Sequence, residues 1–232
     1  MMHQSINKKK IYFYLFILLF LSTTFNFSFV ENIRKSNLLN KIDIEGLSKK
    51  EQEILKNELS MFLDKNIFFL DESEILKKLD AFKFFDKVYI QKILPSTINV
   101  LVKKTRILGI TYIDGKKYFV GKNGKLIPSS QIDNIYELPT IFGNFSVSEF
   151  LILQNIFKKN QIDINKIKKY FYHKNKRWDL EDVNGITIML PSKKIVNSLK
   201  IYNSLIENNK IEKLRIIDLR IPNQIVLTHE EK

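Results

Sequence analysis

From Lys41 onward, the order of apolar and polar positions predicts a strand followed by a helix. Ile42 and Ile44 alternate with polar residues, which is the period of a strand with one buried face. Glu51 follows Ser48 at the spacing of a capping box, so a helix is expected to begin there. The apolar positions that should form its buried face are Ile54, Leu55, Leu59, Phe62 and Leu63.

The same region continues with a second helix and two strands. Asp71 and Glu74 repeat the capping spacing before a helix whose apolar face is predicted to contain Ile75, Leu76, Leu79 and Phe82. Strands are expected over 87–93 and 98–102. The run Leu94-Pro95-Ser96-Thr97 between them predicts a turn, because proline fixes φ and has no N–H to donate.

This order of elements resembles a POTRA domain, with the pattern β-α-α-β-β over 41–105. The residues that carry the resemblance are Ile42-x-Ile44-x-Gly46, Leu70-Asp71, Val88, Leu94-Pro95 and Ile98-x-Val100. The family pattern also has a Glu-Arg/Lys-x-Pro run after the last strand, where this chain reads Lys103-Lys104-Thr105-Arg106. The bend of the junction to the next domain is therefore left open.

After Arg106 the pattern changes to short strands and tight turns. Strands over 107–113 and 116–120 meet across Asp114-Gly115, and Asn123-Gly124 predicts the next turn. Ser146 and Glu149 form a third capping spacing, which predicts a helix. Its apolar residues are Phe150, Leu151, Leu153, Ile156 and Phe157.

The last part of the chain predicts a hairpin, a helix and a final strand. Segments 177–180 and 186–190 pair across Asn184-Gly185, and a helix with Ile195, Leu199 and Tyr202 follows Pro191-Ser192. One strand is expected over 214–227, at a sheet edge or bent at Pro222. The fold class is therefore α+β, with a β-rich second domain that carries two helices.

Ile11 to Val30 is twenty residues without a charge, about 30 Å as a helix, which predicts a single transmembrane segment. A secretory signal peptide is the alternative, since polar residues dilute the second half, but the cleavage site ending at Ser22-Thr23-Thr24 is poor. Lys8, Lys9 and Lys10 favour a cytoplasmic N-terminus. The predicted limits are a cytoplasmic tail at 1–10, a transmembrane helix at 11–30, a linker at 31–40, domains at 41–105 and 106–228, and a tail at 229–232.

Composition argues against several other classes of protein. The chain has 232 residues and no cysteine, which excludes disulfides and thiolate metal sites. Its net charge of +13 is spread over the whole length, together with abundant Ile, Asn and Phe. This pattern is typical of a biased codon pool, so we do not predict nucleic-acid binding.

Catalytic groups are not evident in the sequence. His3, His173 and His229 have no recurrent spacing, and no glycine-rich phosphate loop follows a strand. Two acidic groups raise glycan hydrolysis as an alternative. The first group is Asp71, Glu72 and Glu74, which a helix start explains. The second group is Asp179, Glu181 and Asp182, which positions on a strand and in a turn explain.

Nearly the whole chain resembles the bacterial cell-division family FtsQ/DivIB. One apolar segment, a POTRA-like domain and a β-rich domain follow in that order, and the β-rich domain carries the matching motifs. These are Leu138-Pro139-x-Ile141-x-Gly143, Trp178-x-Leu180, Asn184-Gly185-Ile186-x-Ile188-x-Leu190 and Ile217-Asp218-Leu219-Arg220-x-Pro222.

The resemblance implies a non-catalytic divisome scaffold in the bacterial inner membrane, single-pass, with its bulk in the periplasm and concentrated at the septum. It implies the bitopic proteins FtsB/DivIC and FtsL as partners and, through them, FtsW and FtsI. No cofactor, metal, nucleic acid or small-molecule substrate is implied. A POTRA-bearing component of a polypeptide-export system is the alternative, although that class continues into a long barrel.

The final strand is the expected partner-binding element, because an edge strand offers unpaired backbone groups. Arg220 is carried over from the resemblance by direct match. Ile221, Asn223, Val226 and Leu227 follow from their position on the strand. Core packing is an equally good interpretation of Ile221, so both stay open.

Overall fold

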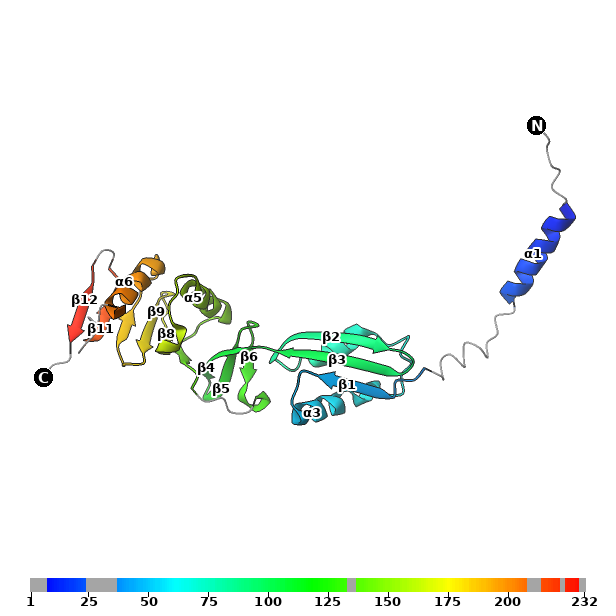
Figure 1. Cartoon of the computed structure of the whole chain (residues 1–232), viewed down its shortest axis with the longest axis horizontal. Helices are drawn as coiled ribbons and strands as arrows, with labels where there is room; N and C mark the ends of the chain where they lie inside the picture. Colours follow the sequence, from blue (N-terminus) through cyan, green and yellow to red (C-terminus); the bar gives the residue numbers. More distant parts are fainter. Residues whose placement is uncertain (1–7, 24–36, 133–136, 208–213, 222–223, 230–232) are drawn as a thin grey trace, which may run out of the picture. The chain divides into compact units, whose positions relative to one another are not determined.

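A computed structural model describes residues 8–23, 37–132, 137–207, 214–221 and 224–229 (Figure 1). The chain divides into two compact units, Met1–Ile75 with Tyr89–Leu101 and Leu76–Val88 with Val102–Lys232. Five α-helices and two β-sheets are present among the described residues. The α+β class is confirmed, and the domain limits drawn from the sequence stay a prediction.

The predicted order β-α-α-β-β is confirmed between residues 41 and 104. The three strands form one sheet in the order β1-β3-β2, with β1 and β3 parallel. The elements are β1 (Lys41–Glu45), α3 (Lys49–Leu59), the 3₁₀ turn η1 (Ser60–Phe62), α4 (Glu72–Leu79), β2 (Phe85–Ile93) and β3 (Thr97–Lys104).

The first helix of this region begins where the capping box predicts. The Ser48 hydroxyl accepts from the Glu51 backbone N–H, and the Glu51 carboxylate accepts from the Ser48 N–H at 2.9 Å. Leu55 and Leu59 are buried as expected, whereas Ile54 is 47% exposed. The predicted apolar face is therefore too wide, because a helix that covers a small sheet turns only a narrow stripe inward.

The second unit contains a nine-stranded sheet in the order β12-β11-β10-β9-β8-β7-β4-β5-β6. The pairs β4–β7, β7–β8 and β10–β11 are parallel, and the other pairs with a described register are antiparallel. The strands are β4 (Ile107–Ile113), β5 (Lys116–Gly121), β6 (Leu126–Pro128), β7 (Thr140–Phe142), β8 (Ile167–Tyr172), β9 (Trp178–Asp182), β10 (Thr187–Met189), β11 (Leu214–Asp218) and β12 (Val226–His229).

One face of this sheet forms the core. A row of directly paired residues crosses five strands and is fully buried: Ile141, Tyr170, Leu180, Ile188 and Ile217. The helices α5 (Val147–Lys159) and α6 (Ile195–Glu207) cover this face (Figure 1). They contribute Phe150, Leu153, Phe157, Leu199 and Tyr202 to the same cluster. The two predicted helices of the β-rich domain are confirmed.

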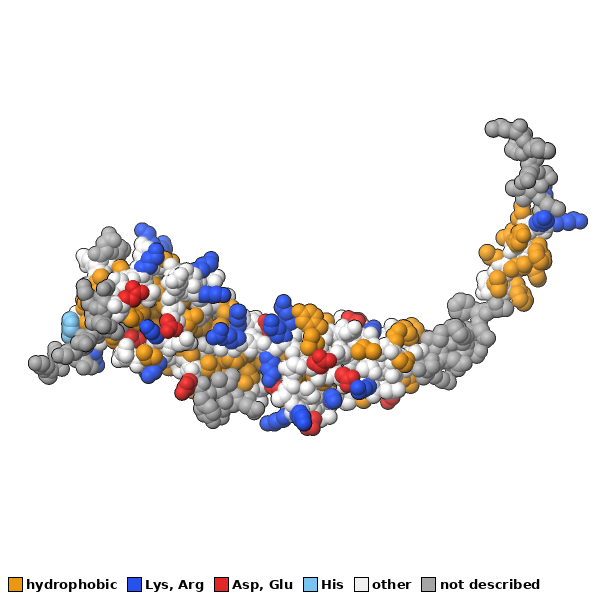
Figure 2. Space-filling model, viewed as in Figure 1, with side chains coloured by type: hydrophobic (Ala, Val, Ile, Leu, Met, Phe, Trp, Pro, Cys, Tyr) orange, Lys and Arg blue, Asp and Glu red, His pale blue; other side chains and the backbone are white. Residues whose placement is uncertain are grey.

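The N-terminal helix α1 spans Lys8–Thr23 and is covered with hydrophobic side chains from Ile11 to Leu21 (Figure 2). Among the described residues, no helix combines the length and the apolar character that a membrane crossing requires. The predicted span at 11–30 continues past the end of α1, and its residues 24–30 lie outside the described part of the chain.

The prediction of a single final strand over 214–227 is wrong. β11 ends at Asp218, and the chain returns as β12, which pairs antiparallel with β11. Pro222 lies in the sequence between the two strands and has no N–H for a ladder, so a continuous strand is disfavoured there. The side chain of Leu219 is buried, and that of Ile221 is half exposed.

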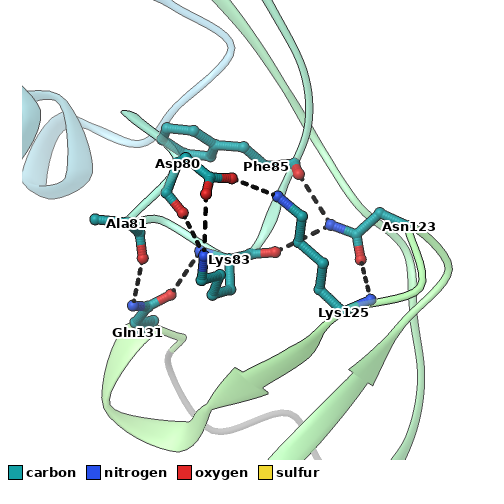
Figure 3. A network of polar contacts seen from close by, with 7 residues as sticks. All are labelled: Asp80, Ala81, Lys83, Phe85, Asn123, Lys125 and Gln131. Carbon is teal, nitrogen blue, oxygen red and sulfur yellow. Dashed lines mark hydrogen bonds and ion pairs between the residues drawn. The ribbon is translucent and has the colours of Figure 1, made fainter. Parts of the chain in front are cut away.

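A network of hydrogen bonds in the second unit joins the segment 80–85 to the turn before β6 (Figure 3). The amide of Asn123 donates to the carbonyl oxygens of Lys83 and Phe85 at 3.0 and 2.9 Å. The side chain of Gln131 accepts from the Lys83 N–H and donates to the Ala81 carbonyl. Two side-chain amides thus satisfy backbone groups of the segment that leads into β2.

Replacing Asn123 by alanine should lower the free energy of unfolding of the second unit by about 2 kcal/mol, because partly buried carbonyl groups lose their donors. Urea denaturation followed by the fluorescence of Trp178 measures this change. Lys125→Ala is the matched control in the same network, since its ion pair with Asp80 at 2.8 Å is exposed to water. Equal stability of the two variants would contradict a structural role for the Asn123 amide.

Candidate partner-binding edge

β12 is the terminal strand of the nine-stranded sheet, and all four of its residues are exposed. Its described partner is β11, with Ile217 opposite Leu227 and Asp218 opposite Val226. A strand with one neighbour directs half of its backbone N–H and C=O groups away from the sheet. The edge can therefore accept a further strand from another chain.

Apolar side chains lie on both faces of this edge. Leu227 extends the buried row that ends at Ile217, yet its own side chain is 38% exposed. Val226 lies on the opposite face beside Asp218 and is 49% exposed. A strand added to β12 would cover apolar surface on each face of the sheet, in addition to pairing the backbone.

Arg220 is held beside this edge by Asp218. Its guanidinium donates through Nε to Oδ1 at 2.9 Å and through Nη2 to Oδ2 at 2.6 Å, while the Arg220 N–H donates to Oδ1. These hydrogen bonds hold the pKa of the Asp218 carboxyl below its ordinary value of 3.8, and they raise the pKa of Arg220. The pair fixes the position of the guanidinium, and the Arg220 side chain as a whole is 43% exposed.

A groove of about 590 Å³ lies between the start of α6 and the segment that follows β11. Ile221 lines it with its side chain 51% exposed, so core packing does not describe this residue. The groove carries four cationic side chains, from Arg177, Lys193, Lys194 and Arg220. Its chemistry favours an extended segment with both apolar and acidic side chains.

The structure places four of the five residues predicted to bind a partner. Arg220 and Ile221 line the groove, and Val226 and Leu227 lie on β12. Asn223 lies outside the described residues. Their role in binding stays a prediction.

Sequence reasoning missed the other cations of the groove, Arg177, Lys193 and Lys194. Lys193-Lys194 at the start of a predicted helix was a visible signal, but nothing local linked these lysines to Arg220. That link comes from the pairing of β9, β10 and β11, which places Asp179, Met189 and Asp218 in one row.

The acidic residues that raised glycan hydrolysis have structural partners. Asp179 is buried against Arg177 and His173, and Glu181 pairs with Lys169 at 2.8 Å. Asp182 accepts from backbone N–H groups of the β9–β10 turn. In the other acidic group, the carboxylate of Asp71 accepts from Ser73 at the start of α4. The geometry supports the structural interpretation of both groups.

Comparison with known proteins points to one family. The family model described as "Cell division protein FtsQ/DivIB, C-terminal" matches residues 109–220, which includes α5, α6 and the groove residue Arg220. Cell division protein FtsQ of Rickettsia bellii (strain RML369-C) is 27% identical over 188 residues, covering 80% of this chain and 70% of the relative. FtsQ of Rhizobium meliloti (strain 1021) is 18% identical over 203 residues, covering 87% of this chain and 66% of that protein.

One solved structure is also similar to part of the chain. It is the major extracytoplasmic domain of the trans isomer of the cell-division protein DivIB from Geobacillus stearothermophilus. The match has 10% sequence identity, covers 47% of this chain and 98% of that chain, and gives a TM-score of 0.32. A TM-score this low does not establish a common fold.

Proposed function

This chain belongs to the FtsQ/DivIB family of cell-division proteins, and from that premise we propose that it is a non-catalytic scaffold that recruits and regulates the septal peptidoglycan synthesis machinery. Its partners are the bitopic proteins FtsB/DivIC and FtsL, and through them FtsW and FtsI. The observation that carries the proposal is the position of β12 as the terminal strand among the described residues, with apolar residues on both faces. A groove with cationic side chains, lined by Arg220, Ile221 and Gln224, lies next to it in the sequence.

The partner binds by adding an extended segment to β12. Backbone pairing supplies hydrogen bonds that any sequence can make, so specificity must come from the side chains next to the edge. Ile221 offers an apolar contact, and Arg220, Lys193 and Lys194 offer charged ones, whereas Arg177 is paired with the buried Asp179. A partner segment with an apolar residue and an acidic residue near its paired strand fits these contacts.

The scaffold is anchored in the inner membrane by residues 11–30, with the N-terminus in the cytoplasm and the folded units in the periplasm. Two features of the sequence support this part of the proposal: the twenty positions carry no charge, and three lysines precede them. Binding at β12 then takes place outside the cytoplasm, at the division septum.

Ile221→Glu tests the edge as the site of binding. The side chain is half exposed, so the variant should fold normally, whereas a carboxylate beside the proposed apolar contact should reduce partner affinity at least about tenfold. Co-purification with the FtsB/DivIC-type protein of the same organism, quantified by titration, measures the loss. Circular dichroism verifies that the variant is folded.

Ile152→Glu is the matched control, because Ile152 is 61% exposed on α5 of the same unit. The same change there should leave affinity at the wild-type value. If Ile221→Glu binds as well as Ile152→Glu, the groove beside β12 is not where the partner docks.

A further inference from the structure

Four exposed apolar side chains lie at one end of the first unit. Phe68 and Phe69 occupy the turn before α4, Ile93 is the last residue of β2, and Leu94 begins the turn between β2 and β3. Their exposed fractions are 52%, 68%, 44% and 58%. We call this set the entry patch, and Figure 2 shows hydrophobic side chains gathered at this end of the unit.

The two turns lie next to each other and next to the segment by which the chain enters the unit. The Lys92 ammonium at the end of β2 donates to the Leu70 carbonyl at 2.7 Å, which joins the turns. The Ile67 N–H donates to the Asn37 carbonyl, and the Asn40 N–H donates to the Ser96 carbonyl, both at 2.9 Å. The entry segment therefore runs between the two turns.

The exposure of the phenylalanines follows from the local sequence. The Asn66 side chain accepts from the Phe68 N–H at 2.9 Å, and the Phe69 N–H donates to the Asn66 carbonyl. This tight turn directs Ile67 and Leu70 into the core, where they are 0% and 5% exposed. Two large aromatic side chains at the tip of a turn are more than half exposed, which a binding role would explain.

The position of the patch in the chain indicates what it binds. Asn37 is separated from the end of α1 by residues 24–36, and thirteen extended residues reach at most about 47 Å. The patch surrounds the point where this connection joins the unit. If α1 and the residues after it are in a bilayer, the patch is on the part of the unit tethered nearest to the lipid headgroups, where aromatic side chains are favoured.

The charges near the patch decide how it would bind. Lys41 pairs with Asp43 at 2.7 Å, and Lys65 pairs with Glu74 at 3.9 Å. The Lys92 ammonium is bound to the Leu70 carbonyl and interacts electrostatically with the Asp71 carboxylate, so each of these three lysines has an acidic side chain near it. Attraction to anionic lipid is then weak, and insertion of apolar side chains is the main driving force.

We propose that the entry patch inserts into the interface of the membrane that holds the N-terminal segment, and docks the first unit against the phospholipid surface. This inference rests on the membrane anchor in the proposed function. Docking would give the first unit a second contact with the membrane, in addition to its covalent connection to α1, and would restrict the orientation of this unit relative to the lipid surface.

Spin labels on the full chain in phospholipid vesicles test the proposal, and the absence of native cysteine makes each label unique. The labelled variants are Phe69→Cys and Leu94→Cys in the patch, and Phe16→Cys in α1. Leu101→Cys is the matched control, because Leu101 is 44% exposed and lies on β3 away from the patch. Leu101 pairs with Glu45, whereas Thr97, at the end of β3 beside the patch, pairs with Lys41. Collision with lipid-soluble oxygen and with a water-soluble nickel complex reports the depth of each label.

Oxygen collisions should dominate at positions 16, 69 and 94, and nickel collisions should dominate at 101. This pattern should persist in high salt and in purely zwitterionic vesicles. Nickel collisions dominating at 69 and 94 while oxygen dominates at 16 would overturn the docking and leave the anchor intact. Nickel dominating at 16 as well would overturn both the anchor and the docking that depends on it.

Discussion

Replacing Gly143 by alanine is expected to lower the free energy of unfolding of the second unit by about 3 kcal/mol or more, because the backbone conformation and the available space both exclude a side chain. Gly143 has a φ of +100°, in the region that disfavours L-residues. A Cβ atom there would lie 2.2 Å from the Tyr172 carbonyl oxygen. That oxygen belongs to the backbone of β8, so it cannot move without disturbing the sheet.

Gly185→Ala separates the two causes. Gly185 has a φ of +80° in the β9–β10 turn, with no atom within 4 Å of the place where a Cβ would lie. Gly185→Ala should therefore lower the free energy of unfolding by only about 1 kcal/mol, which is the cost of a positive φ at an alanine. Urea denaturation of both variants, followed by Trp178 fluorescence, measures the difference. If both variants lose the same free energy of unfolding, the backbone near Tyr172 can move to make room for the added methyl group without destabilising the unit.

Local patterns predicted the elements whose cause is local. The capping boxes at Ser48–Glu51 and Ser146–Glu149 are both formed. The turn residues Asp114 and Gly115 both have positive φ, as a two-residue hairpin loop requires. In each case, the atoms that stabilise the feature lie within a few residues of one another, so the sequence contains the whole explanation.

Features that depend on distant pairing were not predictable in the same way. β8 was missed between the helix α5 and the hairpin at Asn184-Gly185. It pairs in parallel with β7 and antiparallel with β9, and the tight turn from β8 to β9 over 173–177 contains no glycine or proline that would mark it in the sequence. The final strand was predicted as one because Ile217, Leu219 and Ile221 alternate with polar residues. Alternation gives the face of a strand but not the point at which the chain reverses.

The candidate edge shows the same limit. Sequence position was enough to select Val226 and Leu227, since the last strand of a sheet tends to lie at an edge. The groove needed the sheet order, because β10 lies between β9 and β11 and brings Arg177 near Arg220 across it. A family resemblance can carry over one matched residue, but the neighbours that give it a chemical environment come from the fold.

Asp182→Ala is expected to lower the free energy of unfolding by about 4 kcal/mol, because two buried donors and one partly buried donor lose a common acceptor. The carboxylate is 1% exposed. One oxygen accepts from the N–H groups of Asn184 and Ile186 at 2.8 and 2.9 Å, and the other accepts from the Tyr202 hydroxyl at 3.2 Å. Burial and this carboxylate raise the pKa of the Tyr202 hydroxyl, which extends the pH range over which it donates this hydrogen bond.

Glu181→Ala, one residue earlier, is the matched control for this change. Glu181 pairs with Lys169 on the face of the sheet away from α6, and such partly exposed pairs contribute up to about 1 kcal/mol. Asp182→Asn keeps one acceptor oxygen and should fall between the two alanine variants. Because Tyr202 is on α6 and Asp182 is on β9, the loss should also loosen the helix that forms one side of the groove. Faster amide hydrogen exchange in α6 of Asp182→Ala, but not of Glu181→Ala, would connect this buried carboxylate to the shape of the partner-binding edge; unchanged exchange would confine its effect to the turn.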